Sequence, residues 1–151
     1  KTYTETQSNQ ERTALWRANI EMIKDYPIFG VGLGANKNHL RHYYDIFGYP
    51  ADQRQSHAHN QYLQYWAGTG TLGFICFLIF LGTLLRYAYR GYKNSTNPQI
   101  RYLHLALLSG LICFLVGSLT EANINVAKNR FFFLILAALA VALSPTKKTH
   151  T

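Results

Sequence analysis

The feature that most constrains this chain is a run of eighteen residues without a charged side chain, GTGTLGFICFLIFLGTLL at residues 68–85. Because an α-helix rises about 1.5 Å per residue, such a run approaches the length that a helix needs to cross the hydrocarbon of a bilayer. A second uncharged run of the same length occupies residues 103–120, with His104 near its start. A polar first part cancels these runs in the average hydropathy, so a soluble globular domain is the wrong expectation.

The last apolar run, FFFLILAALAVAL at residues 131–143, has only thirteen residues. It is too short to cross a bilayer alone. A spanning helix there would have to begin near Asn125 and carry Lys128 and Arg130 at its edge. We therefore predict an all-α chain with three transmembrane helices, at residues 62–85, 102–120 and 130–144.

The basic residues predict the orientation of these helices. The link at residues 86–101 contains four Lys or Arg residues and no acid, and the tail at residues 145–151 contains two lysines. Cytoplasmic loops carry such an excess of positive charge. Residues 1–61 have a nearly balanced charge and residues 121–129 are short and mixed, so we place both on the opposite side.

The formal net charge of +8 does not indicate a nucleic-acid partner, because the excess lies in the predicted cytoplasmic link and tail. Cys76 and Cys113 both fall inside predicted spans. There they behave as small apolar residues, and we predict neither a disulfide nor a metal site from them. The chain starts at Lys1 without a signal-like segment, so we expect it to be a piece of a longer protein.

In the polar part, a helical pattern runs over residues 10–26 and ends at Pro27. The next residues, PIFGVGLG, contain three glycines at alternate positions, which permit tight turns and close approach of the backbone to a neighbour. Since no βαβ pattern surrounds them, a dinucleotide-binding loop is rejected. A further short helix is expected at residues 38–47.

The most informative string is His57-Ala58-His59-Asn60, directly before the first apolar helix. Near neutral pH an imidazole can take the proton of a hydroxyl that is becoming a nucleophile, provided that it lies within hydrogen-bond reach. The alternative is that both histidines are merely tolerated at a membrane surface. The spacing alone does not separate these interpretations.

His59-Asn60, followed after nine residues by GTLG at residues 70–73, resembles the HN-x9-GxxG signature of the O-antigen ligase and polymerase superfamily. Two upstream motifs resemble the periplasmic segment of the same family: Arg12 with Trp16 and Ala18, and PIFGVGLG at residues 27–34. The resemblance covers about residues 11–85. It implies a multi-pass, integral membrane helical bundle of the bacterial inner membrane, with residues 1–61 as a periplasmic loop that contains short helices.

The resemblance also implies a reaction. A glycosyltransferase of this family moves a glycan from undecaprenyl diphosphate onto an acceptor, here the lipid A-core oligosaccharide in lipopolysaccharide biosynthesis. It uses no cofactor and no metal, inverts the anomeric centre, and contacts membrane lipid. We expect these 151 residues alone to be inactive, because the family's donor site also uses helices that they lack.

The shared motifs leave the acceptor open. An O-antigen polymerase and a protein O-oligosaccharyltransferase carry the same signature. A transporter or a passive membrane anchor is a remoter alternative, because transporters place ionisable groups in mid-membrane and the predicted spans have almost none.

Among the site residues, His59 matches the essential histidine of the family, with general base as its implied role, and Arg12 matches the functional arginine that binds the donor diphosphate. Arginine suits that task because its planar fork forms paired hydrogen bonds with phosphate oxygens. The candidate supporting residues are Asn60, Trp16, Arg17, Arg41, His57, Lys128 and Arg130.

Each assignment has a plainer alternative. Arg12, Arg17 and Arg41 can be solvated residues of a wet face, whereas Lys128 and Arg130 can snorkel from a helix end. Glycines 70 and 73 are expected to permit close helix packing within the membrane. An interfacial aromatic belt, as an alternative to sugar stacking, accounts for most of five residues: Tyr43, Tyr44, Tyr62, Tyr65 and Trp66.

Overall fold

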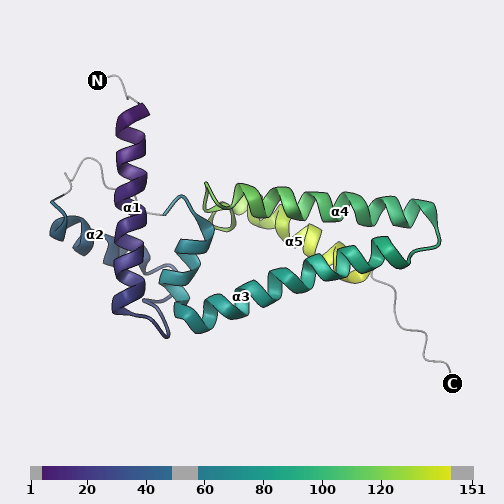
Figure 1. The fold of residues 1–151 in the computed structure, drawn as a ribbon, viewed down its shortest axis with the longest axis horizontal. Coiled ribbons are helices and arrows are strands. Elements are labelled where there is room, and N and C mark those ends of the chain that lie inside the picture. The colour runs from purple at the N-terminus through teal and green to yellow at the C-terminus, as the bar shows by residue number, and fades with distance from the viewer. Residues whose placement is uncertain (1–4, 49–57, 144–151) are drawn as a thin grey trace. The chain divides into compact units, whose positions relative to one another are not determined.

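The computed structural model describes residues 5–48 and 58–143, with side chains described from Glu11 onward. These residues form helices and connecting turns, without a strand among them (Figure 1). The elements are α1 (Glu5–Asp25), α2 (Asn36–Ile46), α3 (Gln61–Asn94), α4 (Pro98–Gly117), the 3-10 helix η2 (Asn123–Asn125) and α5 (Ala127–Ala142). The prediction of an all-α chain is confirmed for the described residues.

The chain divides into two compact units. The first unit comprises Lys1–Phe77 together with Ser118–Ala122, and the second comprises Leu78–Gly117 together with Asn123–Thr151. The helix α3 therefore contributes its beginning to the first unit and its remainder to the second. All three sequence motifs lie in the first unit.

In the first unit, α1 packs against α2 through one apolar face. Leu15, Ala18 and Met22 recur at helical spacing and are buried. They form a core with Leu40 and Tyr43 of α2. The helix α1 ends at Asp25, one residue before the predicted end and two residues before Pro27, and it begins at Glu5 instead of the predicted residue 10. This core anchors α1 and thereby Trp16.

A polar contact closes the same interface near the end of α1. The hydroxyl of Tyr43 donates a hydrogen bond of 2.5 Å to Oδ2 of Asp25. Burial of the Tyr43 ring, together with this bond to a carboxylate, raises the pKa of the phenol well above its ordinary value. The Tyr43 hydroxyl therefore stays protonated and serves as a donor that ties α1 to α2.

The second unit is built from apolar helices. Phe114 of α4 stacks on Phe133 of α5 with ring centroids 4.9 Å apart. Near the other end of α4, the buried His104 ring lies against Gly91, and its Nε2 is 2.9 Å from the carbonyl oxygen of Leu143. A side chain at position 91 would overlap that ring. Gly91 therefore permits the close approach of α3 to α4.

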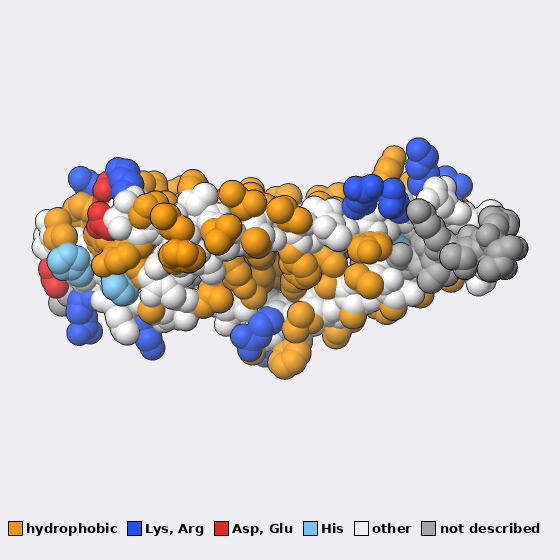
Figure 2. Space-filling view, turned by 90° about the horizontal axis from the view of Figure 1, so that it is seen from below, with side chains coloured by type: hydrophobic (Ala, Val, Ile, Leu, Met, Phe, Trp, Pro, Cys, Tyr) orange, Lys and Arg blue, Asp and Glu red, His pale blue; other side chains and the backbone are white. Residues whose placement is uncertain are grey.

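Two helices, α3 and α4, have the length and apolar composition to cross a membrane. Only 28% and 22% of the most apolar 18-residue segments of α3 and α4 are buried. The core helix of a soluble protein would be mostly buried. Figure 2 shows hydrophobic side chains gathered on the surface that faces the viewer. With 16 residues, α5 is shorter than a typical transmembrane helix, so the third span stays a prediction.

The helices differ from the predicted spans at their ends. The helix α3 continues to Asn94 and α4 begins at Pro98, so most of the predicted link at residues 86–101 is helical. At the other end, the run predicted as one helix is interrupted at Gly70, whose φ of 65° and ψ of −174° are not helical. This interruption organises the candidate site.

Candidate functional site

The interruption of α3 is filled by the glycine-rich segment that follows α1. Four hydrogen bonds join the two backbones: Val31 N–H to the Ala67 carbonyl (3.0 Å), Gly32 N–H to the Gly68 carbonyl (2.8 Å), Thr71 N–H to the Pro27 carbonyl (2.8 Å), and Leu72 N–H to the Ile28 carbonyl (3.4 Å). The loop thus satisfies carbonyl and N–H groups that the broken helix leaves without intrahelical partners. The PIFGVGLG and GxxG motifs are therefore two sides of one contact.

Glycine is required where the backbones meet. A Cβ atom on Gly70 would lie 2.2 Å from the Ile28 carbonyl oxygen, and one on Gly30 would lie 2.5 Å from the Gly70 nitrogen. Both glycines have positive φ, 65° and 67°, which other residues adopt only at a cost. The expectation that Gly70 serves packing between membrane helices was wrong, because its neighbour is the backbone of the loop at residues 27–32. Gly73 instead makes room for the side chain of Thr69 in the same helix.

Aromatic rings brace the interruption from both sides. Trp66, before it, stacks on Phe74, after it, with centroids 5.0 Å apart and planes within 2°. The Trp66 indole also donates a hydrogen bond of 3.1 Å to the Thr71 hydroxyl. Tyr65 stacks on Phe77 at 4.3 Å. These rings contact one another, so their position is explained by the shape of α3 without a bound sugar.

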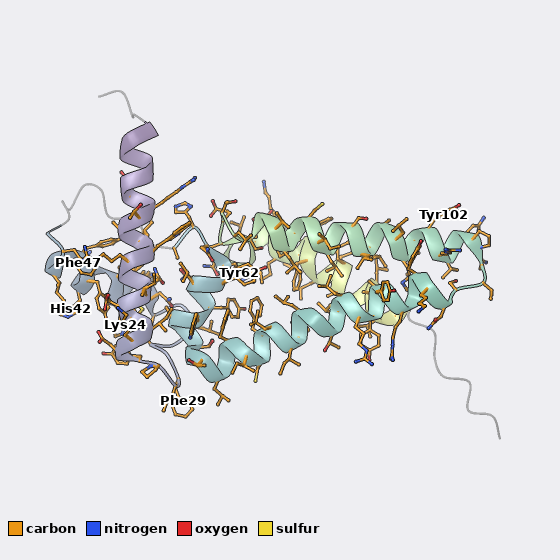
Figure 3. The ribbon with its side chains drawn as sticks, in the orientation of Figure 1. Lys24, Phe29, His42, Phe47, Tyr62 and Tyr102 are labelled. Atoms are coloured by element: carbon orange, nitrogen blue, oxygen red, sulfur yellow. The ribbon has the colours of Figure 1, made fainter. Side chains whose placement is uncertain are left out.

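Asn60 directly precedes α3 and acts as its N-cap. Its Oδ1 accepts hydrogen bonds from the N–H groups of Tyr62 (3.0 Å) and Leu63 (3.1 Å), as a capping side chain does. Figure 3 labels Tyr62 in this first turn. The spacing of HN-x9-GxxG therefore measures one helical segment, from its cap at Asn60 to its interruption at Gly70. The sequence named Asn60 as a supporting residue but did not predict the cap.

Ala58, the residue before His59, is held in place by one side chain of α1 and one side chain of α3. The Trp16 indole of α1 donates to the Ala58 carbonyl at 3.1 Å, and the Ala58 N–H donates to Oε1 of Gln64 at 3.0 Å. Ala58 is fully buried. The backbone that carries His59 is thus fixed by α1 and by the first turn of α3.

His59 itself has a φ of 46°, in the left-handed region. For a residue with a Cβ this costs about 1–2 kcal/mol, although histidine tolerates it better than most. The hydrogen bonds on both sides hold the residue in this conformation. Such local strain is concentrated at functional sites, and here it occurs at the residue whose ring contacts Glu121.

The His59 ring meets a carboxylate. Its Nδ1 lies 3.1 Å from Oε2 of Glu121, and the two side chains are 23% and 40% exposed. The other carboxylate oxygen of Glu121 accepts a hydrogen bond of 3.1 Å from the Ala122 N–H. A carboxylate is an acceptor, so a neutral His59 donates from Nδ1 and keeps its lone pair on Nε2. An imidazole in this state can accept a proton from a hydroxyl.

Arg12 lies on the exposed surface of α1, four residues before Trp16. Residues at this spacing share a helix face. Arg12 is therefore one helical turn from the side chain that binds the peptide next to His59. Among the described side chains no carboxylate pairs with Arg12, which leaves its guanidinium available to an anionic ligand.

The remaining candidates separate into different places. Arg17 lies over the Phe47 ring at 4.3 Å, and so joins α1 to the end of α2. Phe47 is labelled in Figure 3. Arg41 is exposed on α2. Lys128 and Arg130 are exposed on α5, in the second unit. His57 lies outside the described residues. Arg12, Trp16, His59 and Asn60 thus lie in the first unit together with Arg17 and Arg41, and Arg17 makes a packing contact there.

Glu121 was missed as a site residue by the sequence analysis. A signal existed, since Glu121 is the only acidic residue after Asp52. Its place beside His59, 62 positions earlier, comes from the fold. In the described part of the chain, no group of three His, Cys, Asp or Glu side chains is arranged to hold a metal ion.

Comparison with known proteins agrees with these motifs. A family model described as O-Antigen ligase matches residues 2–78. The teichuronic acid biosynthesis protein TuaE of Bacillus subtilis (strain 168) is 26% identical over 137 residues, which are 89% of this chain and 26% of that protein. The chain therefore spans about a quarter of the length of this relative. No solved structure matches.

Proposed function

Because this chain belongs to the O-antigen ligase family, a family of membrane enzymes that polymerise or ligate glycans, we propose that it forms the acceptor-activating part of a larger glycosyltransferase. One observation carries the proposal. His59, the histidine of the family signature, is held in a left-handed conformation with its Nδ1 against the Glu121 carboxylate. This arrangement suits a general base whose other nitrogen receives a proton.

The reaction follows from that chemistry. Nε2 of His59 takes the proton of an acceptor sugar hydroxyl, and the resulting oxygen attacks the anomeric carbon of the donor. The bond from that carbon to the diphosphate oxygen breaks, and the lipid diphosphate leaves with the electron pair. Attack from the face opposite the leaving group inverts the anomeric configuration.

The donor in this proposal is a glycan on undecaprenyl diphosphate. A departing diphosphate needs positive charge, which Arg12 supplies without a metal ion. The exposed guanidinium of Arg12, one turn from the Trp16 contact to the His59 segment, supports this role. Paired hydrogen bonds from a planar guanidinium fit phosphate oxygens well.

Three acceptors fit the family. The first is the lipid A-core oligosaccharide, which would make the whole protein a ligase of lipopolysaccharide biosynthesis. The second is another lipid-linked glycan, which would make it a polymerase. The match to a protein named for teichuronic acid biosynthesis favours the second. A protein acceptor uses the same chemistry.

We place this site on the periplasmic side of the bacterial inner membrane. In the full-length protein, with Cys76 and Cys113 replaced by serine, Asn94→Cys is expected to react with a membrane-impermeant maleimide only after the cells are opened. Lys37→Cys, exposed on α2, is the matched position and is expected to react in intact cells. Labelling of position 94 from outside would overturn this orientation.

The donor role of Arg12 has its own test. In the full-length protein, Arg12→Lys keeps the charge but loses the fork. A hydrogen bond to a charged group contributes about 1.5–3 kcal/mol, so glycan transfer is expected to fall about 10- to 100-fold. Arg41→Lys, on the exposed surface of α2, is the control and is expected to transfer normally. Equal rates for both variants would remove the donor role from Arg12.

A further inference from the structure

We propose that Glu121 is the positioning residue of His59: its carboxylate fixes the Nδ1–H tautomer and the orientation of the ring, so that Nε2 is the nitrogen that receives the proton. This inference rests on the proposed function of His59. It adds a residue that the signature motif does not contain and that lies on a separate segment of the chain.

The carboxylate is held relative to the ring by backbone contacts on both sides. Oε1 of Glu121 accepts the N–H of the buried Ala122, while Oε2 lies 3.1 Å from Nδ1 of His59. Three residues before Glu121, the buried Ser118 accepts a hydrogen bond of 2.9 Å through its carbonyl from the Gln61 N–H, in the first turn of α3. The segment Ser118–Ala122 is therefore fastened to the helix that His59 precedes.

The fixed position of the Glu121 carboxylate matters because an imidazole has two neutral tautomers. With the proton on Nε2, the nitrogen proposed as the base could not accept another. A carboxylate beside Nδ1 selects the productive tautomer and also stabilises the imidazolium that forms when the acceptor loses its proton. A surface ion pair with a purely structural role would do neither, and such pairs contribute little to folding.

The test uses the full-length protein with Glu121→Gln and Glu121→Asp. Glutamine preserves the length and an oxygen for the Ala122 N–H, but its amide can donate to Nδ1 and so favours the wrong tautomer. We expect Glu121→Gln to reduce the transfer rate by about 10²- to 10⁴-fold, the usual range for a base catalyst, and Glu121→Asp to restore part of the rate. Glu21→Gln, which removes an exposed partner of Lys24, is the matched control and is expected to leave the rate unchanged.

A second measurement separates positioning from folding. If Glu121 acts through His59, adding Glu121→Gln to His59→Asn changes the residual rate by less than about threefold, because residues that act as a unit are not additive. Nitrogen NMR of ¹⁵N-histidine-labelled protein should show the Nδ1–H tautomer of His59 in the parent and its loss in Glu121→Gln. Where the residual rate is too low to measure, the NMR signal decides.

The outcomes distinguish the two claims. A normal rate for His59→Asn would remove the proposed base and this inference with it. A low rate for His59→Asn with a normal rate for Glu121→Gln, a full additional loss in the double variant, or an unchanged tautomer would overturn the role of Glu121 alone.

Discussion

Replacing His59 by asparagine in the full-length protein is expected to reduce glycan transfer by about 10²- to 10⁴-fold, which is what loss of a general base costs. Asparagine is the informative choice because, like histidine, it tolerates the left-handed backbone that this position adopts at a φ of 46°. The variant therefore removes the imidazole while it retains the local conformation. The readout is the surface polysaccharide of a strain that lacks the native gene, separated by gel electrophoresis.

Membrane abundance of the His59→Asn protein, measured by immunoblot, should remain close to that of the parent. His59→Ala should lose transfer as well, with some added backbone strain. His57→Ala is the control on the neighbouring imidazole and is expected to have a mild effect, because only His59 stands in register with Asn60 and the GxxG motif. A normal polysaccharide pattern with His59→Asn would return this histidine to a structural role.

The second large effect is expected at the contact between the two glycine motifs. Gly70→Ala places a Cβ atom 2.2 Å from the Ile28 carbonyl oxygen and forces alanine to a φ of 65°. Left-handed backbone costs about 1–2 kcal/mol and overpacking about 1–3 kcal/mol. The free energy of unfolding is therefore expected to fall by about 2–5 kcal/mol, which is enough to unfold a marginally stable protein. Thermal unfolding in detergent, with yield after size-exclusion chromatography, measures the loss.

The matched control for Gly70→Ala is Gly82→Ala, in the same helix. A Cβ atom at position 82 would meet nothing within 4 Å. The melting temperature of the Gly82→Ala protein should therefore stay near that of the parent. Gly30→Ala, which approaches the Gly70 nitrogen from the other side of the contact, should resemble Gly70→Ala. Equal stability of the Gly70 and Gly82 variants would show that the loop does not pack against the interruption of α3.

The sequence predicts the helices well but does not predict the contact between the glycine-rich loop and α3. The apolar runs predicted α3 and α4, and Pro27 marked the end of α1, because burial in lipid and the geometry of proline act locally. The interruption at Gly70 was missed, since an isolated glycine in an apolar helical pattern is normally tolerated. What breaks the helix is the backbone of residues 27–32, about 40 positions earlier.

The candidate site divides in the same way. His59 and Arg12 were predicted from motif resemblance, and the cap role of Asn60 was open to prediction from its place before an apolar helix. The contact of His59 with Glu121 was not, because it joins positions 62 residues apart. Arg17 was named as a supporting residue, but its guanidinium lies over Phe47, a neighbour that helical spacing along α1 alone does not reveal.

The most direct test of the proposed chemistry is the anomeric configuration of the product. Full-length protein in proteoliposomes would receive a synthetic undecaprenyl diphosphate-linked oligosaccharide and a glycan acceptor, and the new glycosidic linkage would be assigned by NMR. We predict a linkage inverted relative to the donor, one undecaprenyl diphosphate released for each linkage formed, and loss of both products with His59→Asn. Retention of configuration, or equal product from the His59→Asn protein, would contradict direct attack by a hydroxyl that His59 deprotonates.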